Sequence, residues 1–292
     1  MVSIPIVQQL ISRGHETAII AHSNDHLCLA QRIDGLKEMV LSSEFAVRKH
    51  AFDDIHLDFR AHPLQRNYWW ISNDFASKFP RYKIGDILKH MCRDFGVYYD
   101  KALLHPLISQ PRKETLGKII FIPGSAGSSK CWPSEHWFEL NMRLRALGFG
   151  TVMIGRPRDL FPMRRLIKDG LKWHVPASLD EALDFISSAH AVISVDTGLM
   201  HLSIQQSRTT IGIYKHSPLY LREFPHSFPV IAKEPCFGAC YKEQMKATGG
   251  LLPGEQPAFR MRDWDCINPE SGCMASIGPE SVLKAVRTAL SV

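Results

Sequence analysis

Short apolar segments alternate with amphipathic segments through the second half of the chain, and this alternation restricts the fold more than any other feature. Apolar runs of this length predict buried strands, and the segments between them have the apolar spacing of helices. Strands are expected at 118–122, 151–154, 191–195 and 209–214, and helices at 134–147, 159–168, 179–188, 197–206 and 280–290. Repeated strand–helix units with buried strands predict an α/β fold whose parallel sheet is covered on both faces.

The first half of the chain has the same alternation in a weaker form. Helices are expected at 4–11 and 84–95, and strands at 17–20 and 55–59. A polar connector that contains proline, 107–114, precedes the strong strand at 118–122 and is typical of a domain boundary. We therefore expect one domain over 1–112 and a second over 113–292.

The composition is typical of a globular enzyme, with 45% hydrophobic and 22% charged residues among 292. The sequence has neither an apolar run long enough for a membrane span nor a secretory signal at its start, so a cytoplasmic protein is expected. The net charge of +6 comes from basic residues that are spread along the chain, and this pattern does not predict a nucleic-acid partner. A mild positive charge favours anionic substrates or an anionic membrane surface, or it serves solubility alone.

A glycine- and serine-rich turn follows the strand at 118–122. Residues 124–129 contain two glycines and three serines, which offer backbone amides and hydroxyl groups, and Lys130 follows them. A lysine ammonium beside such a turn suits a phosphate group. A flexible turn with a solvated lysine is the alternative that this segment leaves open.

A second polar turn, Asp196-Thr197-Gly198, follows the strand at 191–195 and begins a helix. Parallel strands end at the same edge of a sheet, where ligands of such folds bind. Gly198 permits close approach of a ligand, and Thr197 and the backbone amides can hold a phosphate oxygen. His201 lies one helical turn beyond Thr197, on the same side. Asp196 can bond a sugar hydroxyl or orient a neighbouring side chain.

Taken together, Lys130-Cys131-Trp132-Pro133 and Asp196-Thr197-Gly198-x-x-His201 resemble the donor half of glycosyltransferase family 9, the bacterial ADP-heptose heptosyltransferases. The resemblance is close over about 117–215 and 265–290, and only architectural over 1–110. It implies a GT-B fold, in which two Rossmann-like domains face a cleft. It also implies an inverting transfer of a heptose or related sugar from an ADP-sugar to a hydroxyl of a lipopolysaccharide or protein acceptor, with peripheral contact at the inner membrane.

The same resemblance implies which residues contact the donor. Asp159 matches an acidic residue that contacts the ribose, although a helix N-cap is an equally good interpretation. The segment 178–181 matches the part of the family that lies near the adenine. Trp132 is expected to pack and fix the loop. The donor site is therefore expected to comprise Ser125, Ser128, Lys130, Asp159, Asp196, Thr197, Gly198 and His201.

Four of the seven cysteines lie late in the chain, at Cys236, Cys240, Cys266 and Cys273. In a cytosolic chain such clustering indicates a metal site or thiols rather than disulfides, and sulfur ligands favour zinc or iron. A subgroup of the family that glycosylates autotransporter adhesins holds iron with four cysteines, which suggests a structural metal here. No catalytic metal is expected, because Lys130 and the helix amides can neutralise the leaving group.

The start of the chain departs from the family. Residues 2–5 resemble the middle of the first helix, so the first strand of the N-terminal domain and the Gly-Asp turn after it are expected to be absent, either because the start is truncated or because another residue takes the place of that Asp. That Asp is the proposed general base in many members. The best substitutes are Asp58 and His62, at the end of the predicted strand at 55–59, and Arg60 is a candidate for an acceptor phosphate or carboxylate. Two other interpretations remain: an inactive protein that binds nucleotide sugars, and a cysteine-rich, metal-bound structural or assembly protein.

Overall fold

The structure is a computed structural model, and it describes part of the 292-residue chain. The described residues are 4–21, 23–44, 84–100, 105–108, 110, 117–125, 130–160, 163–214, 224–232 and 273–292.

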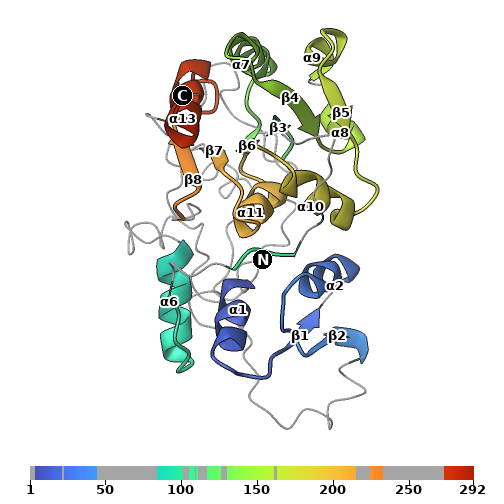
Figure 1. Ribbon diagram of the computed structural model, residues 1–292, viewed down its shortest axis with the longest axis vertical. Coiled ribbons are helices and arrows are strands. Elements are labelled where there is room, and N and C mark those ends of the chain that lie inside the picture. Colours follow the sequence, from blue (N-terminus) through green and yellow to red (C-terminus); the bar gives the residue numbers. More distant parts are fainter. Residues whose placement is uncertain are drawn as a thin grey trace, which may run out of the picture.

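A six-stranded parallel sheet organises the second half of the chain (Figure 1). Its spatial order is β5-β4-β3-β6-β7-β8. The strands are β3 (Lys118–Ile122), β4 (Gly150–Ile154), β5 (Lys172–His174), β6 (Ala191–Val195), β7 (Thr210–Tyr214) and β8 (Ser227–Ile231). The four strands that the apolar runs predict form the centre of this sheet, so the predicted parallel α/β architecture is confirmed.

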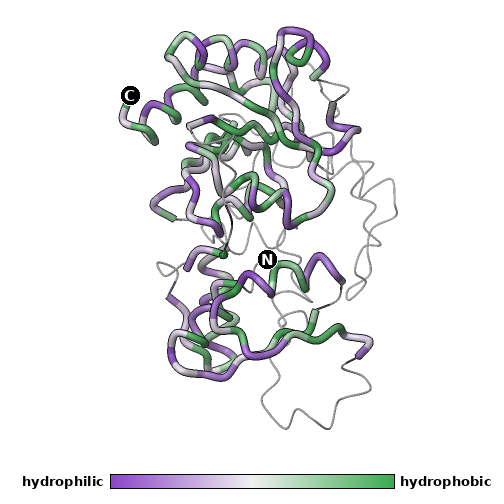
Figure 2. Tube along the Cα trace, turned by 45° about the vertical axis from the view of Figure 1, so that its right-hand side comes forward, coloured by the Kyte–Doolittle hydropathy of each residue, from purple (hydrophilic) through white to green (hydrophobic). Residues whose placement is uncertain are grey.

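Helices cover both faces of the sheet. Residues of one face pack on α7 (Ser134–Ala146), α9 (Arg164–Lys168) and α13 (Pro279–Leu290), and those of the other face pack on α10 (Leu179–Ser187). Strands β6 and β7 are buried at every position, as expected for central strands of a parallel sheet. Figure 2 shows the same division, with apolar strands inside and alternating polar and apolar residues along the outer helices.

Both edge strands of this sheet were not predicted from the sequence, and two short helices were predicted as one. Strand β5 has only three residues, and β8 contains Pro229, which an edge strand tolerates because one side of its backbone needs no partner. The single helix expected at 159–168 is instead α8 (Pro157–Leu160) and α9, with Pro162 between them in the sequence. A proline interrupts a helix because it lacks an amide hydrogen.

The described part of the first half contains a small parallel sheet and three helices. Strands β1 (Ala18–Ala21) and β2 (Glu38–Leu41) pair in parallel, with α2 (Asn24–Gln31) between them in the chain. Helices α1 (Ile4–Ser12) and α6 (Ile84–Asp94) agree with the predicted helices. The strand predicted at 55–59 lies outside the described residues.

The two halves meet through an apolar cluster and through the segment 105–110. Buried side chains of the first half pack directly on α10 and on α11 (Gly198–Gln205) of the second half. These side chains are Ile4, Leu29, Ile33 and Leu107 from the first half and Leu183 and Leu202 from the second. None of the helices in the described ranges is long and apolar enough to cross a membrane.

Candidate functional site

The candidate site lies where the neighbouring strands β3 and β6 end. These strands run parallel, and Ile122 is in register with Ser194, so the turns that follow them leave the sheet at the same edge. The turn after β3 leads to Lys130, and the turn after β6 leads to α11. The topology therefore brings two segments about 70 residues apart to one place.

An ion pair joins the two turns directly. The Lys130 ammonium lies 2.6 Å from Oδ2 of Asp196, and the Ser125 hydroxyl donates to the backbone carbonyl of Asp196 at 3.0 Å. Two residues of the loop after β3 thus contact the same residue of the turn after β6. Lys130 is therefore paired with Asp196, unlike the solvated lysine of the alternative interpretation.

His201 completes the arrangement from the first turns of α11. Its Nε2 lies 3.1 Å from Oδ1 of Asp196, so each carboxylate oxygen of Asp196 has its own partner. The Asp196 and His201 side chains are each only 13% exposed, and the Lys130 side chain is 24% exposed. Of the two roles that the sequence suggested for Asp196, the geometry favours orienting its neighbours.

The pKa of Asp196 reflects this environment. Burial alone would raise the pKa, but the hydrogen bond from His201 and the positive charge of Lys130 outweigh burial and hold it well below the ordinary 3.8. Asp196 is therefore a carboxylate at neutral pH. The negative charge of Asp196 holds the Lys130 ammonium beside the turn after β6.

The N-terminus of α11 differs from those of two other helices. In α2 and α10 the N-cap serine accepts a hydrogen bond from a first-turn amide, with Ser23 bonding His26 and Ser178 bonding Glu181. The N-cap of α11 is Thr197, whose side chain makes no such bond. The amides at this helix start are therefore not capped by their own N-cap side chain, and such amides attract anions.

Trp132 fixes the loop that carries Lys130. Its indole is 1% exposed, donates a hydrogen bond of 2.8 Å to the Ile277 carbonyl, and lies edge-on to Trp137 with ring centroids 5.0 Å apart. Because Lys130 is two residues away, the buried indole limits where the ammonium can lie. The packing role predicted for Trp132 agrees with these contacts.

Asp159 lies against the same edge of the sheet. Its carboxylate accepts a hydrogen bond from the Arg156 amide at 2.9 Å and is 10% exposed. A Cβ placed on Gly124 would lie 2.3 Å from Cγ of Asp159, so Gly124 is the residue type that lets this carboxylate approach the loop after β3. Asp159 sits within α8 rather than preceding a helix as an N-cap.

His174 forms a group with two side chains of α10 that was not predicted from the sequence. The His174 and Phe185 rings stack at 4.1 Å, and His174 Nε2 lies 3.4 Å from Glu181. The Ser178–Glu181 segment was expected near an adenine, but His174 was missed because the three-residue strand that carries it was not predicted. The signal that could have found it is a histidine at the carboxyl end of a strand. In the structure His174 lies next to the turn after β4, where the Gly155 amide donates to the His174 carbonyl.

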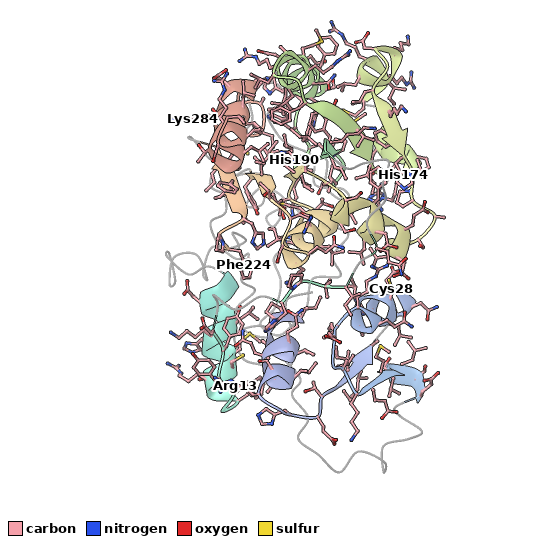
Figure 3. All side chains as sticks on the ribbon, viewed as in Figure 1. Arg13, Cys28, His174, His190, Phe224 and Lys284 are labelled. Carbon is pink, nitrogen blue, oxygen red and sulfur yellow. The ribbon has the colours of Figure 1, made fainter. Side chains whose placement is uncertain are left out.

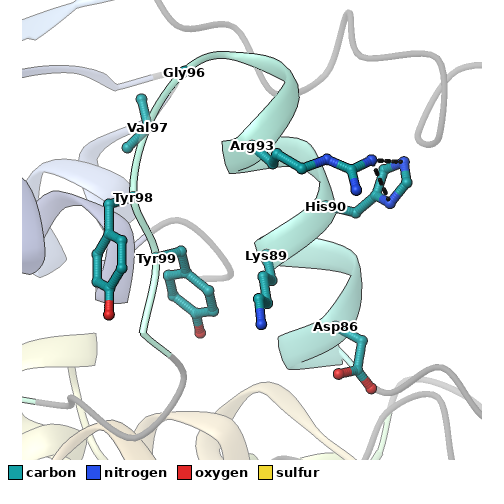
Figure 4. A pocket seen from close by; sticks show the side chains of 8 residues that line it. All are labelled: Asp86, Lys89, His90, Arg93, Gly96, Val97, Tyr98 and Tyr99. Atoms are coloured by element: carbon teal, nitrogen blue, oxygen red, sulfur yellow. Dashed lines mark hydrogen bonds between the residues drawn. The ribbon is translucent and has the colours of Figure 1, made fainter.

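A separate hollow of about 680 Å³ lies in the first half, between α6 and the segment that follows it (Figure 4). Cationic and aromatic side chains dominate its lining. The lining residues are Asp86, Lys89, His90, Arg93, Gly96, Val97, Tyr98 and Tyr99. This surface suits a ligand with an anionic group and a flat or ring-shaped part.

Several predicted site residues lie outside the described residues. These are Asp58, His62, Ser128, Cys236, Cys240 and Cys266. Cys273 is described, and its side chain is buried in the core beneath α13. Within the described ranges, no group of three or more His, Cys, Asp or Glu side chains is arranged to hold a metal ion.

The chain is similar to known glycosyltransferases. The family described as glycosyltransferase family 9 (heptosyltransferase) matches residues 103–246. Lipooligosaccharide heptosyltransferase 2 of Haemophilus influenzae is 31% identical over 113 residues, which are 35% of this chain and 32% of that protein. The aligned part therefore spans about a third of this relative.

Solved structures match over nearly the whole chain. A family 9 glycosyltransferase from Veillonella parvula has a TM-score of 0.67 at 15% identity, covering 99% of this chain and 93% of its own. The iron-containing dodecameric glycosyltransferase TibC of enterotoxigenic Escherichia coli has a TM-score of 0.61 at 15% identity, covering 98% and 71%, and a TibC structure holds ADP-D-β-D-heptose. These likenesses support the predicted GT-B fold.

Proposed function

We propose that this chain, whose residues 103–246 match glycosyltransferase family 9, transfers a heptose or related sugar from an ADP-sugar to a hydroxyl group of a glycan or protein acceptor. Lipopolysaccharide is the acceptor class that the related heptosyltransferases suggest. One observation carries this proposal: Lys130, His201 and the uncapped start of α11 converge around the buried Asp196.

This arrangement suits a diphosphate. A lysine ammonium has three N–H donors, so Lys130 can keep its bond to Asp196 and still donate to a phosphate oxygen. The amides at the start of α11 and the Thr197 hydroxyl would bind further oxygens. Ser125, Ser128 and Gly198 complete the diphosphate site in this proposal.

The reaction follows from where charge develops. The acceptor oxygen attacks the anomeric carbon and forms the new glycosidic bond, while the bond from that carbon to the diphosphate oxygen breaks and the configuration inverts. The departing ADP gains negative charge, which Lys130 and the helix amides stabilise. The acceptor proton passes to a general base, for which we propose Asp58 or His62.

We propose residues for the rest of the donor from their place near the same edge of the sheet. Asp159, next to Gly124, is proposed to bond the ribose. The stacked pair His174 and Phe185, with the start of α10, is proposed to line the adenine site. Asp159 follows β4 and His174 ends β5, and these two strands lie next to β3 in the order β5-β4-β3.

The acceptor half is proposed to bind an anionic acceptor. Lys89 and Arg93 in the hollow beside α6 suit a phosphate or carboxylate, and Tyr98 and Tyr99 suit a sugar ring. A lipid-linked acceptor would bring the protein to the inner face of the bacterial inner membrane, and its positive charge favours such a surface.

Metal enters this proposal only as a structural element. The diphosphate is neutralised by Lys130 and the amides, so no step requires a catalytic ion. We propose that Cys236, Cys240, Cys266 and Cys273 hold structural iron or zinc, as TibC is iron-containing. Metal analysis of the purified protein and of Cys236→Ser tests this assignment, which fails if neither protein contains metal.

An ADP-release assay with ADP-heptose and lipopolysaccharide acceptors tests the main proposal. Turnover should fall at least tenfold in Lys130→Ala and Asp196→Ala, and Lys284→Ala on the exposed face of α13 is the matched control (Figure 3). Turnover unchanged in both site variants would contradict the proposal. Binding of ADP-heptose by calorimetry without any transfer would instead favour a nucleotide-sugar-binding protein.

A further inference from the structure

A single arginine, Arg32, joins the two halves of the molecule. Arg32 follows α2 in the first half, and its side chain is only 12% exposed. Its guanidinium lies between Asp180 and Asp184 of α10 in the second half, 148 and 152 residues further along the chain. Figure 1 shows α2 and α10 facing each other across the two halves.

The guanidinium uses most of its donors in this position. Nε donates to Oδ1 of Asp180 at 2.7 Å, and one terminal nitrogen donates to Oδ1 of Asp184 at 2.7 Å. The terminal nitrogens also donate to the carbonyls of Ile108 and Asp180, at 2.9 and 3.2 Å. A planar fork with this many partners fixes direction as well as distance, which a lysine could not do.

The two carboxylates are placed for this role. Asp180 and Asp184 are four residues apart on α10, so they lie on one face and repel each other unless a cation lies between them. Burial would raise the pKa of Asp180, but hydrogen bonds from Cys28 and Arg32 and the charge of Arg32 hold it below its ordinary value. Burial and the neighbouring Asp180 raise the pKa of Cys28 to about 11, so the thiol adds no charge.

Further hydrogen bonds and apolar contacts surround the Arg32 bridge and, together with it, form a joint between the two halves. The Ile108 amide donates to the Arg32 carbonyl, and the Gln110 amide donates to the Asp184 carboxylate. The segment that joins the two halves is therefore bonded to both Arg32 and Asp184. Leu29 and Ile33, which flank Arg32 closely in sequence, pack with Leu183 of α10 in a buried cluster. Figure 3 labels Cys28 at the side of α2 that meets the second half.

The position of α10 links this joint to the proposed donor site. Helix α10 begins beside His174 and packs on α11, whose first residues form the diphosphate site. All the described donor-site side chains, however, come from the second half. Arg32 bonds Asp180 and Asp184, whereas Glu181 is the α10 residue that contacts His174. A change at Arg32 can therefore alter how the first half lies over the donor without removing a side chain of the proposed donor site.

We propose that Arg32 is a positioning residue for sugar transfer, which holds the acceptor half at the correct orientation over the donor by bridging α2 to Asp180 and Asp184. This inference rests on the proposed function. A displacement of about 1 Å between reacting groups can cost about 100-fold in rate. Loss of Arg32 should therefore lower kcat and leave the affinity for ADP unchanged.

The test uses Arg32→Met and the double variant Arg32→Met/Asp184→Asn. The single variant leaves two carboxylates facing each other, so poor folding could follow from repulsion alone. The double variant removes that repulsion, because Asp180 is then the single charge and is 49% exposed. Arg143→Met is the matched control, since Arg143 also bridges carboxylates of two elements, Glu139 and Glu280, but within the second half and on its surface.

Three quantities are measured on each full-length variant: kcat, the Kd for ADP by calorimetry, and the radius of gyration by small-angle X-ray scattering. We expect the double variant to lose about 10- to 100-fold in kcat, with a Kd within about twofold of wild type and altered scattering, and the Arg143 variant to match wild type. A double variant with unchanged kcat and scattering overturns the inference. So does a Kd that weakens in parallel with kcat, because the effect would then pass through the donor site.

Scattering also separates this inference from the proposed function. If the wild-type protein shows no transfer, the proposed function fails, and only the scattering of the double variant then tests whether Arg32 joins the two halves. Altered scattering then supports Arg32 as the joint between the halves, and unchanged scattering overturns it.

Discussion

Replacing Lys130 by Met should lower both the stability of the folded protein and its affinity for ADP, and the two losses follow from different contacts of Lys130. For stability, exposed ion pairs contribute about 0–1 kcal/mol, and breaking a fully buried pair costs about 3–5 kcal/mol. The Lys130 and Asp196 side chains are 24% and 13% exposed, which places this pair between the limits. We therefore expect a loss of about 2 kcal/mol, or about 4–8 °C in Tm for a chain of this size.

The effect on ADP follows from the hydrogen bond that Lys130 would make. A charge-assisted hydrogen bond contributes about 1.5–3 kcal/mol. Since about 1.4 kcal/mol corresponds to tenfold in affinity, ADP should bind about 10- to 150-fold more weakly. Isothermal calorimetry measures this change, and thermal unfolding followed by circular dichroism measures the loss of stability.

A double-mutant cycle with Asp196→Asn tests whether the two residues act as a pair. If Asp196 serves to hold Lys130, the double variant should be more stable than the sum of the single losses predicts, by about 1–2 kcal/mol. Lys284→Met is the control for replacing an exposed lysine. Losses that add within about 0.3 kcal/mol, or an unchanged ADP affinity, would refute the reasoning.

Three further predictions address the surroundings of the site. Asp196 has a lowered pKa in the folded state, so the stability that its charge contributes is present above its ordinary pKa of 3.8 and is lost as the pH falls below that value. Asp196→Asn should therefore flatten the fall of Tm between about pH 5 and 3. An identical slope of Tm against pH in wild type and variant would contradict this. Trp132→Phe removes the bond to the Ile277 carbonyl and should lower the free energy of unfolding in urea by about 1–2 kcal/mol, whereas Trp132→Ala also removes the ring and should lower it by about 3–5 kcal/mol. Wild-type stability in Trp132→Phe would show that the bond contributes nothing. Gly124→Ala should lower the free energy of unfolding by about 1–3 kcal/mol because its Cβ would meet Asp159. Gly278→Ala is the control and should be near neutral, since its Cβ would meet nothing within 4 Å. Equal Tm values for the two variants would exclude the contact between Gly124 and Asp159.

The central strands and the two site turns could be predicted because their signals are local. The apolar runs at 118–122 and 191–195 can only be buried, and the polar turns after them contain the residues that a phosphate site requires. The edge strands β5 and β8 could not be found in this way, since three residues and a strand with Pro229 carry little periodicity.

The sequence by itself determined the parallel sheet, the two turns at its edge and the residue types that they present, because burial and helix starts depend on short stretches of chain. Only the tertiary structure decided the partners. It paired Lys130 with Asp196, packed Asp159 against Gly124 and set Arg32 between Asp180 and Asp184. Each of these contacts joins residues far apart in the chain, and charge or size alone does not specify which of many possible partners a side chain meets once the layers pack.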